Sequence, residues 1–204
     1  MSWKPLVALL SLTPLVVLSP VSGDSTTDPR RLVSQALAES LGRKLDAIAK
    51  RHKARARQPE TVVVTEGELN SYLAYTLATE MPAGVSNVAV RFERERIETT
   101  GVVDLDRVGK LQADSALSPL SLLAGPVAVE IRGRLQNQDG FGTIEWEQVR
   151  VASIPLPLSV LARLVASSTR TARQPEGFDI HAPFRLPYSA RRVTLQPGRA
   201  VLEF

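Results

Sequence analysis

Apolar side chains in residues 30–57 recur at spacings of three and four, which predicts one long amphipathic helix. Charged side chains occupy most of the other face, and Pro59 prevents the helix from continuing. The apolar stripe consists of Val33, Leu37, Leu41, Leu45, Ile48 and Ala49.

A β-branched strand at residues 61–64 leads into a second predicted helix over residues 66–80. Thr65 and Glu68 have the spacing of a capping box, in which each side chain binds the other residue's backbone amide. Asn70 lies inside this helix although asparagine is a mediocre helix former. We therefore expect its side chain to hold a neighbouring backbone segment.

From residue 85 the apolar period changes to two, which is typical of strands with one apolar and one polar face. Two strands are predicted on either side of a connection at residues 93–96, and the second strand ends near Leu105. A clearer hairpin follows over residues 127–151, turning at Asp139-Gly140. Its period breaks between Trp146 and Val149, which predicts a bulge near Glu147.

A third helix is predicted over residues 157–170, and residues 175–187 have the composition of a loop. The chain ends in a hairpin of residues 190–196 and 199–204 around Pro197-Gly198. The order of these elements predicts an α+β fold. In it, a curved antiparallel sheet of hairpins wraps against two or three amphipathic helices, with an apolar groove between them.

The first 23 residues have the layout of a secretory signal peptide. Lys4 is followed by a short apolar run, and Val21-Ser22-Gly23 offers small residues for cleavage. The alternative is an uncleaved anchor, but the run is shorter than the roughly 20 residues of a span. It also contains Pro5 and Pro14. We therefore expect an exported protein, periplasmic or secreted, whose residues 24–204 form a single domain.

Composition narrows the choice of partners and chemistry. The net charge is +4, which suits anionic surfaces such as phospholipid headgroups. Aromatic residues make up 5% of the chain, too few for the stacked platform of a nucleic-acid binder, so we expect no nucleic acid. The chain has no cysteine, so disulfides and thiolate chemistry are excluded.

No motif of an enzyme or a metal site stands out. There is no P-loop, no G-x-S-x-G elbow and no H-E-x-x-H, and the two histidines lack the spacing of metal ligands. Asp104 and Asp106 share one face of a predicted strand, where they either bind a cation weakly or face solvent. We expect no catalytic residue, metal or cofactor.

The end of the first helix is dense in positive charge, with Lys50, Arg51, Lys53, Arg55 and Arg57 lying within two turns. Cations are favourable at a helix C-terminus and on a solvated face. The alternative is that they contact anionic lipid headgroups.

An irregular apolar cluster lies between the two central hairpins: Leu117, Leu120, Leu122 and Leu123. Core elements usually show a clean period, whereas entry flaps of binding sites are often loops. We therefore expect this cluster to border a binding site.

Residues 64–73 resemble the T-E-x-E-L-N helix start of YpmS-type exported bacterial proteins, and residues 84–104 resemble their first hairpin. The segments Leu186-Pro187-Tyr188, Arg191-Arg192-Val193 and Pro197-Gly198-Arg199 resemble the close of LmeA-type periplasmic phospholipid-binding proteins. The resemblance covers about half of the mature chain. It implies an apolar groove that holds lipid acyl chains, as in tubular lipid-binding folds, and it supplies no catalytic residues.

The expected function is therefore non-catalytic binding of phospholipid or other acyl chains. The groove is expected to involve Leu73, Leu77, Leu117, Leu120, Leu122, Leu123, Leu161 and Leu164. Two alternatives remain open: an envelope structural module that docks a protein partner through its sheet or basic helix, and an enzyme of unrecognised type.

Overall fold

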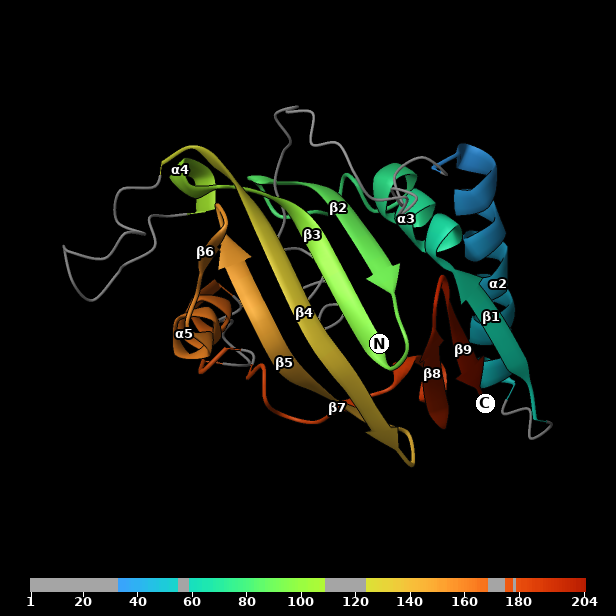
Figure 1. The fold of residues 1–204 in the computed structure, drawn as a ribbon. Coiled ribbons are helices and arrows are strands. Elements are labelled where there is room, and N and C mark those ends of the chain that lie inside the picture. Colours follow the sequence, from blue (N-terminus) through green and yellow to red (C-terminus); the bar gives the residue numbers. More distant parts are fainter. Residues whose placement is uncertain (1–32, 55–58, 109–123, 169–174, 178) are drawn as a thin grey trace.

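The computed structural model describes residues 33–54, 59–108, 124–168, 175–177 and 179–204, and it has the expected α+β fold (Figure 1). The larger of two antiparallel sheets has six strands in the order β2-β3-β4-β5-β6, with β7 also pairing with β5. Its strands are β2 (Val85–Phe92), β3 (Arg96–Asp104), β4 (Pro126–Gln138), β5 (Phe141–Val151), β6 (Ile154–Pro155) and β7 (Phe184–Arg185).

A smaller three-stranded sheet joins distant parts of the chain. Its order is β1-β9-β8, with β1 at Thr61–Thr65, β8 at Arg192–Gln196 and β9 at Arg199–Glu203. The predicted C-terminal hairpin is thus confirmed, and its last strand pairs with the strand that precedes the second helix.

Three helices were predicted, and two of them are shorter than expected. Helix α2 is Gln35–Lys53, α3 is Glu66–Tyr75 and α5 is Leu158–Ser168; the short α4 (Leu105–Val108) and the 3-10 turn η3 (Pro187–Ser189) were not predicted. The first helix begins at Gln35 rather than residue 30, because Ser34 is extended and its hydroxyl accepts the Leu37 amide at 3.3 Å. The second ends at Tyr75 rather than residue 80, where the amides of Thr76 and Leu77 both donate to the Tyr72 carbonyl.

Local predictions in α3 and in the central hairpin are confirmed. The Thr65 hydroxyl accepts the Glu68 amide at 3.2 Å, and the Glu68 carboxylate accepts the Thr65 amide at 3.0 Å, which completes the capping box. Across β4 and β5 the register shifts so that Arg132 and Gly133 face Gln148 and Trp146. Glu147 is thus the extra residue of the expected bulge.

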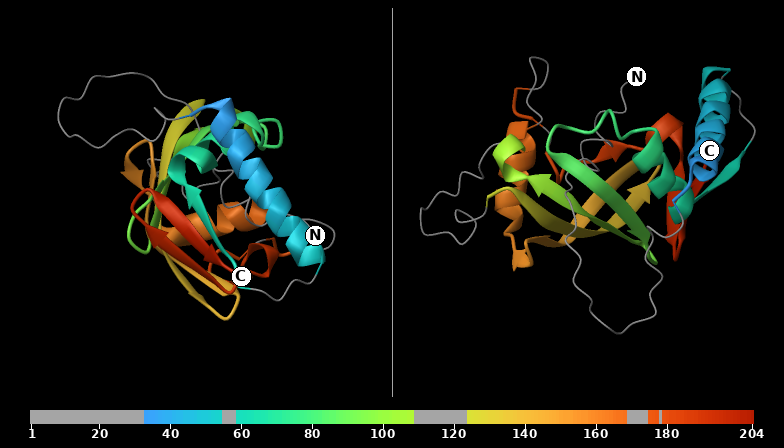
Figure 2. Two further views of the ribbon diagram at one scale, coloured as in Figure 1. Left: turned by 90° about the vertical axis from the view of Figure 1, so that its right-hand side faces the viewer. Right: turned by 90° about the horizontal axis from the view of Figure 1, so that it is seen from above.

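The helices cover opposite ends of the curved sheet (Figure 2). Helix α5 contributes Leu161 and Val165 to one core cluster, together with inward side chains of β3, β4 and β5. Helix α3 contributes Leu73 to a second cluster, with Val90 and Phe92 of β2 and with residues of β8 and β9. The inner face of the sheet between these clusters forms one wall of the candidate site.

Side chains and loops close the junction between the two sheets. Asn137 at the end of β4 binds both backbone groups of Val193 in β8, at 2.7 and 2.9 Å. The Gly198 amide in the β8–β9 turn donates to the Phe92 carbonyl at 3.0 Å. The C-terminal hairpin is thereby fixed against both β2 and β4.

Candidate functional site: an apolar cavity

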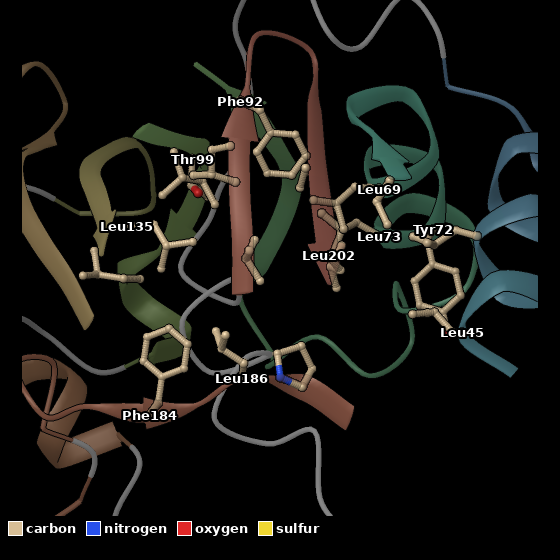
Figure 3. A pocket seen from close by; sticks show the side chains of 18 of the residues that line it. Leu45, Leu69, Tyr72, Leu73, Phe92, Thr99, Leu135, Phe184, Leu186 and Leu202 are labelled. Atoms are coloured by element: carbon tan, nitrogen blue, oxygen red, sulfur yellow. The ribbon is translucent and has the colours of Figure 1, made fainter. Parts of the chain in front are cut away.

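An apolar cavity of about 240 Å³ is lined mainly by residues of the second core cluster and reaches the first cluster at Ile131 and Trp146 (Figure 3). It is larger than the roughly 150 Å³ hydrocarbon-lined cavities that take up benzene in other proteins. Its lining consists of Leu41, Leu45, Val64, Leu69, Tyr72, Leu73, Leu77, Phe92, Ile97, Thr99, Ile131, Leu135, Ile144, Trp146, Phe184, Arg185, Leu186, Pro187, Val193, Leu195, Ala200 and Leu202. Nearly all of these are hydrocarbon side chains drawn from both sheets and from α2 and α3.

The six-stranded sheet supplies the first wall through its period of two. Thr99 on β3 faces Ile131 on β4, and Leu135 on β4 faces Ile144 on β5, all on one side of the sheet. Gly133 lies within this wall, where an added Cβ would be 2.6 Å from the Ile144 Cγ2 atom. The glycine therefore leaves room for its larger cross-strand neighbours.

Helices α2 and α3 supply the second wall. Leu41 and Leu45 belong to the predicted stripe of the first helix, and Leu69 and Leu73 belong to the apolar side of the second. Figure 3 shows Leu45, Leu69, Leu73 and Tyr72 grouped on the helical side of the cavity.

An ionic cluster fixes these two helices to each other. The Lys44 ammonium donates to Glu68 at 2.8 Å and to the Val63 carbonyl at 2.7 Å, and the Ser40 hydroxyl donates to Glu68 at 2.7 Å. Burial alone would raise the pKa of Glu68, but the hydrogen bonds from Lys44, Thr65 and Ser40, with the Lys44 charge, hold that pKa below its ordinary value. The carboxylate therefore stays ionised, and its contacts hold α2, α3 and β1 together.

The third wall is the segment from Phe184 to Pro187, which sequence reasoning treated as a loop. Its two-residue strand β7 pairs with the start of β5, where Phe141 faces Arg185 and Gly142 faces Phe184. A Cβ on Gly142 would lie 2.9 Å from the Phe184 ring, so the missing side chain seats this ring against the sheet. Figure 3 shows Phe184 and Leu186 opposite the helical side.

Few polar groups reach the cavity. The indole nitrogen of Trp146 donates to the Ile180 carbonyl at 2.8 Å and is thereby satisfied. Burial, followed by the proximity of Tyr188, Glu80 and Asp46, raises the pKa of Tyr72, so this phenol is neutral at physiological pH. Thr99 and Arg185 are the other polar residues of the lining, which as a whole can hold a hydrocarbon chain.

The predicted groove residues have different positions. Leu73 and Leu77 line the cavity, whereas Leu161 packs in the core cluster under α5 and does not line it. Leu117, Leu120, Leu122 and Leu123 lie outside the described residues, as does the side chain of Leu164. The expected role of that leucine cluster as a flap stays a prediction.

Of the predicted membrane-contact residues, Lys50, Arg51 and Lys53 lie in the last turn of α2, and Arg51 pairs with Glu60. Arg55 and Arg57 fall outside the described residues. The described part of the chain contains no helix that is long and apolar enough to cross a membrane. The same part shows no group of three His, Asp or Glu side chains placed to hold a metal ion.

Comparison of the chain with protein-family models, with curated proteins and with solved structures finds no match. The resemblance to YpmS-type and LmeA-type proteins therefore stays a prediction.

Proposed function

We propose that this protein is an exported, non-catalytic lipid-binding protein that holds an acyl chain, such as that of a phospholipid, in the cavity between its sheets and helices. One observation carries the proposal: a cavity of about 240 Å³ whose walls are almost entirely hydrocarbon. An acyl chain gains about 0.8 kcal/mol for each methylene that it buries. Space of this kind therefore favours an aliphatic occupant over water, which needs polar partners.

The position of the cavity supports the same proposal. It lies between the inner face of the larger sheet and the α2–α3 pair, and the Phe184–Pro187 segment supplies a further wall. Most small domains fill such a region with core side chains because interiors pack densely. An apolar concave region that core side chains leave unfilled is a common location of a ligand site.

Binding of a fluorescent fatty acid, with mass spectrometry of lipid extracted from the purified protein, tests the proposal. Leu135→Phe adds volume at a half-buried wall position. It should reduce probe binding at least fivefold and leave the melting temperature equal or higher, because it fills space that is otherwise empty.

Val149→Ala is the matched control, since Val149 belongs to the core cluster under α5 and not to the cavity wall. It should cost about 1 kcal/mol or more of stability, as buried methyl deletions do, with unchanged probe binding. A wild-type protein that carries no lipid and binds no probe would overturn the proposal. That result would favour the protein-docking alternative.

A further inference from the structure

The turn between β4 and β5 presents an exposed aromatic side chain. Phe141 follows Asp139-Gly140 directly and is 44% exposed. The guanidinium carbon of Arg185 lies 4.9 Å from the centre of its ring, a cation–π arrangement that holds both side chains at the surface. Phe141 pairs with Arg185 across β5 and β7, so the two exposed side chains lie next to each other, and Arg185 also belongs to the lining of the cavity.

Two more arginines gather at this turn. The Gly140 amide donates to the Arg191 carbonyl at 3.1 Å, and Arg192 precedes Val193, to which Asn137 of β4 is bound. Arg185, Arg191 and Arg192 are all exposed, and none makes an ion pair with another described residue. Asp139 and Glu203 are the carboxylates on the same segments, so positive charge remains in excess.

This surface is continuous with the cavity. Phe184 and Leu186, on either side of Arg185, line the cavity, and so does Val193, which follows Arg192. The same short segments therefore carry exposed arginines beside the hydrocarbon side chains of the cavity, and Arg185 itself belongs to the lining. In Figures 1 and 2 the basic end of α2 points toward the end of the molecule at which the β4–β5 turn lies.

We propose that Phe141, Arg185, Arg191 and Arg192 form the surface by which the protein docks on an anionic lipid bilayer, with the Phe184–Pro187 wall of the cavity next to the membrane. The inference rests on the proposed function for its purpose, namely that lipid passes between bilayer and cavity. Charge complementarity selects the bilayer, because cations near an anionic leaflet are attracted to it. An exposed aromatic ring beside them is suited to the interface between headgroups and acyl chains.

Co-sedimentation of the full chain with phosphatidylglycerol vesicles at low salt, and with phosphatidylcholine vesicles as reference, tests the docking surface. The triple variant Arg185→Gln, Arg191→Gln, Arg192→Gln should bind phosphatidylglycerol at least tenfold more weakly, since each surface cation contributes a factor of about five. Phe141→Ala should weaken binding to a smaller degree that persists at high salt, because screening acts on charges and not on apolar insertion.

The control changes charge equally at exposed arginines elsewhere, by Arg43→Gln, Arg107→Gln and Arg150→Gln. Docking by the proposed surface predicts a clearly smaller loss in this variant. An equal loss of vesicle binding in both triple variants would show that net charge alone determines the binding, and it would overturn the inference. Absence of wild-type binding to phosphatidylglycerol would also overturn the inference. It would favour a protein partner at this surface instead.

Binding of the fluorescent fatty acid without vesicles separates the two proposals. The double variant Arg191→Gln, Arg192→Gln should keep wild-type probe affinity, because neither of these side chains lines the cavity, whereas Arg185 does. A protein that docks on vesicles but binds no probe would refute the proposed function alone. A protein that binds the probe but loses no docking in the Arg185, Arg191 and Arg192 variant would refute the docking surface alone.

Discussion

The carboxamide of Asn70 binds both backbone polar groups of Val90: Nδ2 donates to the carbonyl at 2.9 Å, and Oδ1 accepts from the amide at 2.7 Å. Val90 belongs to β2, the edge strand of the larger sheet, so the side chain takes the place of a neighbouring strand. Glu66 extends the same edge by accepting the Phe92 amide. The expectation that Asn70 holds a neighbouring backbone is thus confirmed.

Replacing Asn70 by alanine should cost roughly 2–4 kcal/mol of stability in urea denaturation, because a buried amide and carbonyl lose their partners together. Asn137→Ala is the matched control, since Asn137 makes the same two contacts with Val193 at a half-buried site. Water can replace the lost contacts there, so the loss should be nearer 1 kcal/mol. Equal losses of stability in the two variants would contradict the view that Asn70 excludes water from the edge of β2.

The Lys44–Glu68 pair should make stability depend on acid pH. The pKa of Glu68 in the folded protein lies below its ordinary value of 4.5, so its ionised form stabilises the fold above that pH. This contribution should fall as pH decreases below about 4.5 through the lower folded pKa. Glu68→Gln should flatten that part of the stability profile, measured by thermal melts between pH 3 and 7.

Removing the cation of this pair should lower the stability of the fold more than removing the anion does. Lys44→Met leaves a carboxylate that is 6% exposed without its cation, whereas Glu68→Gln leaves an ammonium that is 34% exposed and can be solvated. We expect a loss on the order of 3 kcal/mol for Lys44→Met and a smaller one for Glu68→Gln at pH 7. The reverse order would show that the hydrogen bonds to Ser40 and Thr65 outweigh the ion pair.

Gly133→Ala should lower both the stability of the fold and its binding of fatty acid. The new methyl group would meet Ile144 at 2.6 Å and the Trp146 ring at 3.4 Å, and both side chains line the cavity. Overpacking of this kind costs about 1–3 kcal/mol and should displace the wall, which weakens fatty-acid binding. At Gly198 an added Cβ meets nothing within 4 Å, so Gly198→Ala should leave binding unchanged and cost only the strain of its positive φ.

Cleavage of the N-terminal segment should give a mature chain that begins near Asp24. Its signal-peptide pattern is a sequence prediction, and residues 1–32 lie outside the described part of the structure. N-terminal sequencing of protein from the cell envelope tests it. An intact Met1 on protein that resists carbonate extraction from membranes would instead support the uncleaved anchor.

Local pattern predicted most of the fold because each element carries its own signal. The capping box, the turn at Asp139-Gly140 and the bulge at Glu147 are decided by residues close in sequence. The helix ends were less accurate, since Ser34 and Tyr72 act through hydrogen-bond geometry that periodicity does not contain. The division into two sheets depends on pairing between residues 61–65 and 199–203, and a pattern within a short stretch of sequence cannot predict this pairing.

The cavity was predicted only in part for the same reason. Leu73 and Leu77 could be selected because they lie on the apolar side of a predicted helix, but so could Leu161, which fills a core instead. Whether an apolar side chain meets a partner or an empty space depends on how far each helix extends over the sheet. The Phe184–Pro187 wall was missed because two residues of β7 have no period, although the glycine at 142 offered a signal for close approach.

The pairing of β1 with β9 has a consequence for the order of folding. Val64 on the former strand and Leu202 on the latter both line the cavity, yet they come from residues 61–65 and 199–203. Closing so long a loop is entropically costly, and contacts distant in sequence form slowly. The hairpins of the larger sheet and the α2–α3 pair can form from local contacts, so the cavity should be the last part of the molecule to assemble. Until the C-terminal hairpin docks, its apolar walls are open to solvent, and a lipid present at that stage could be enclosed as the protein folds around it.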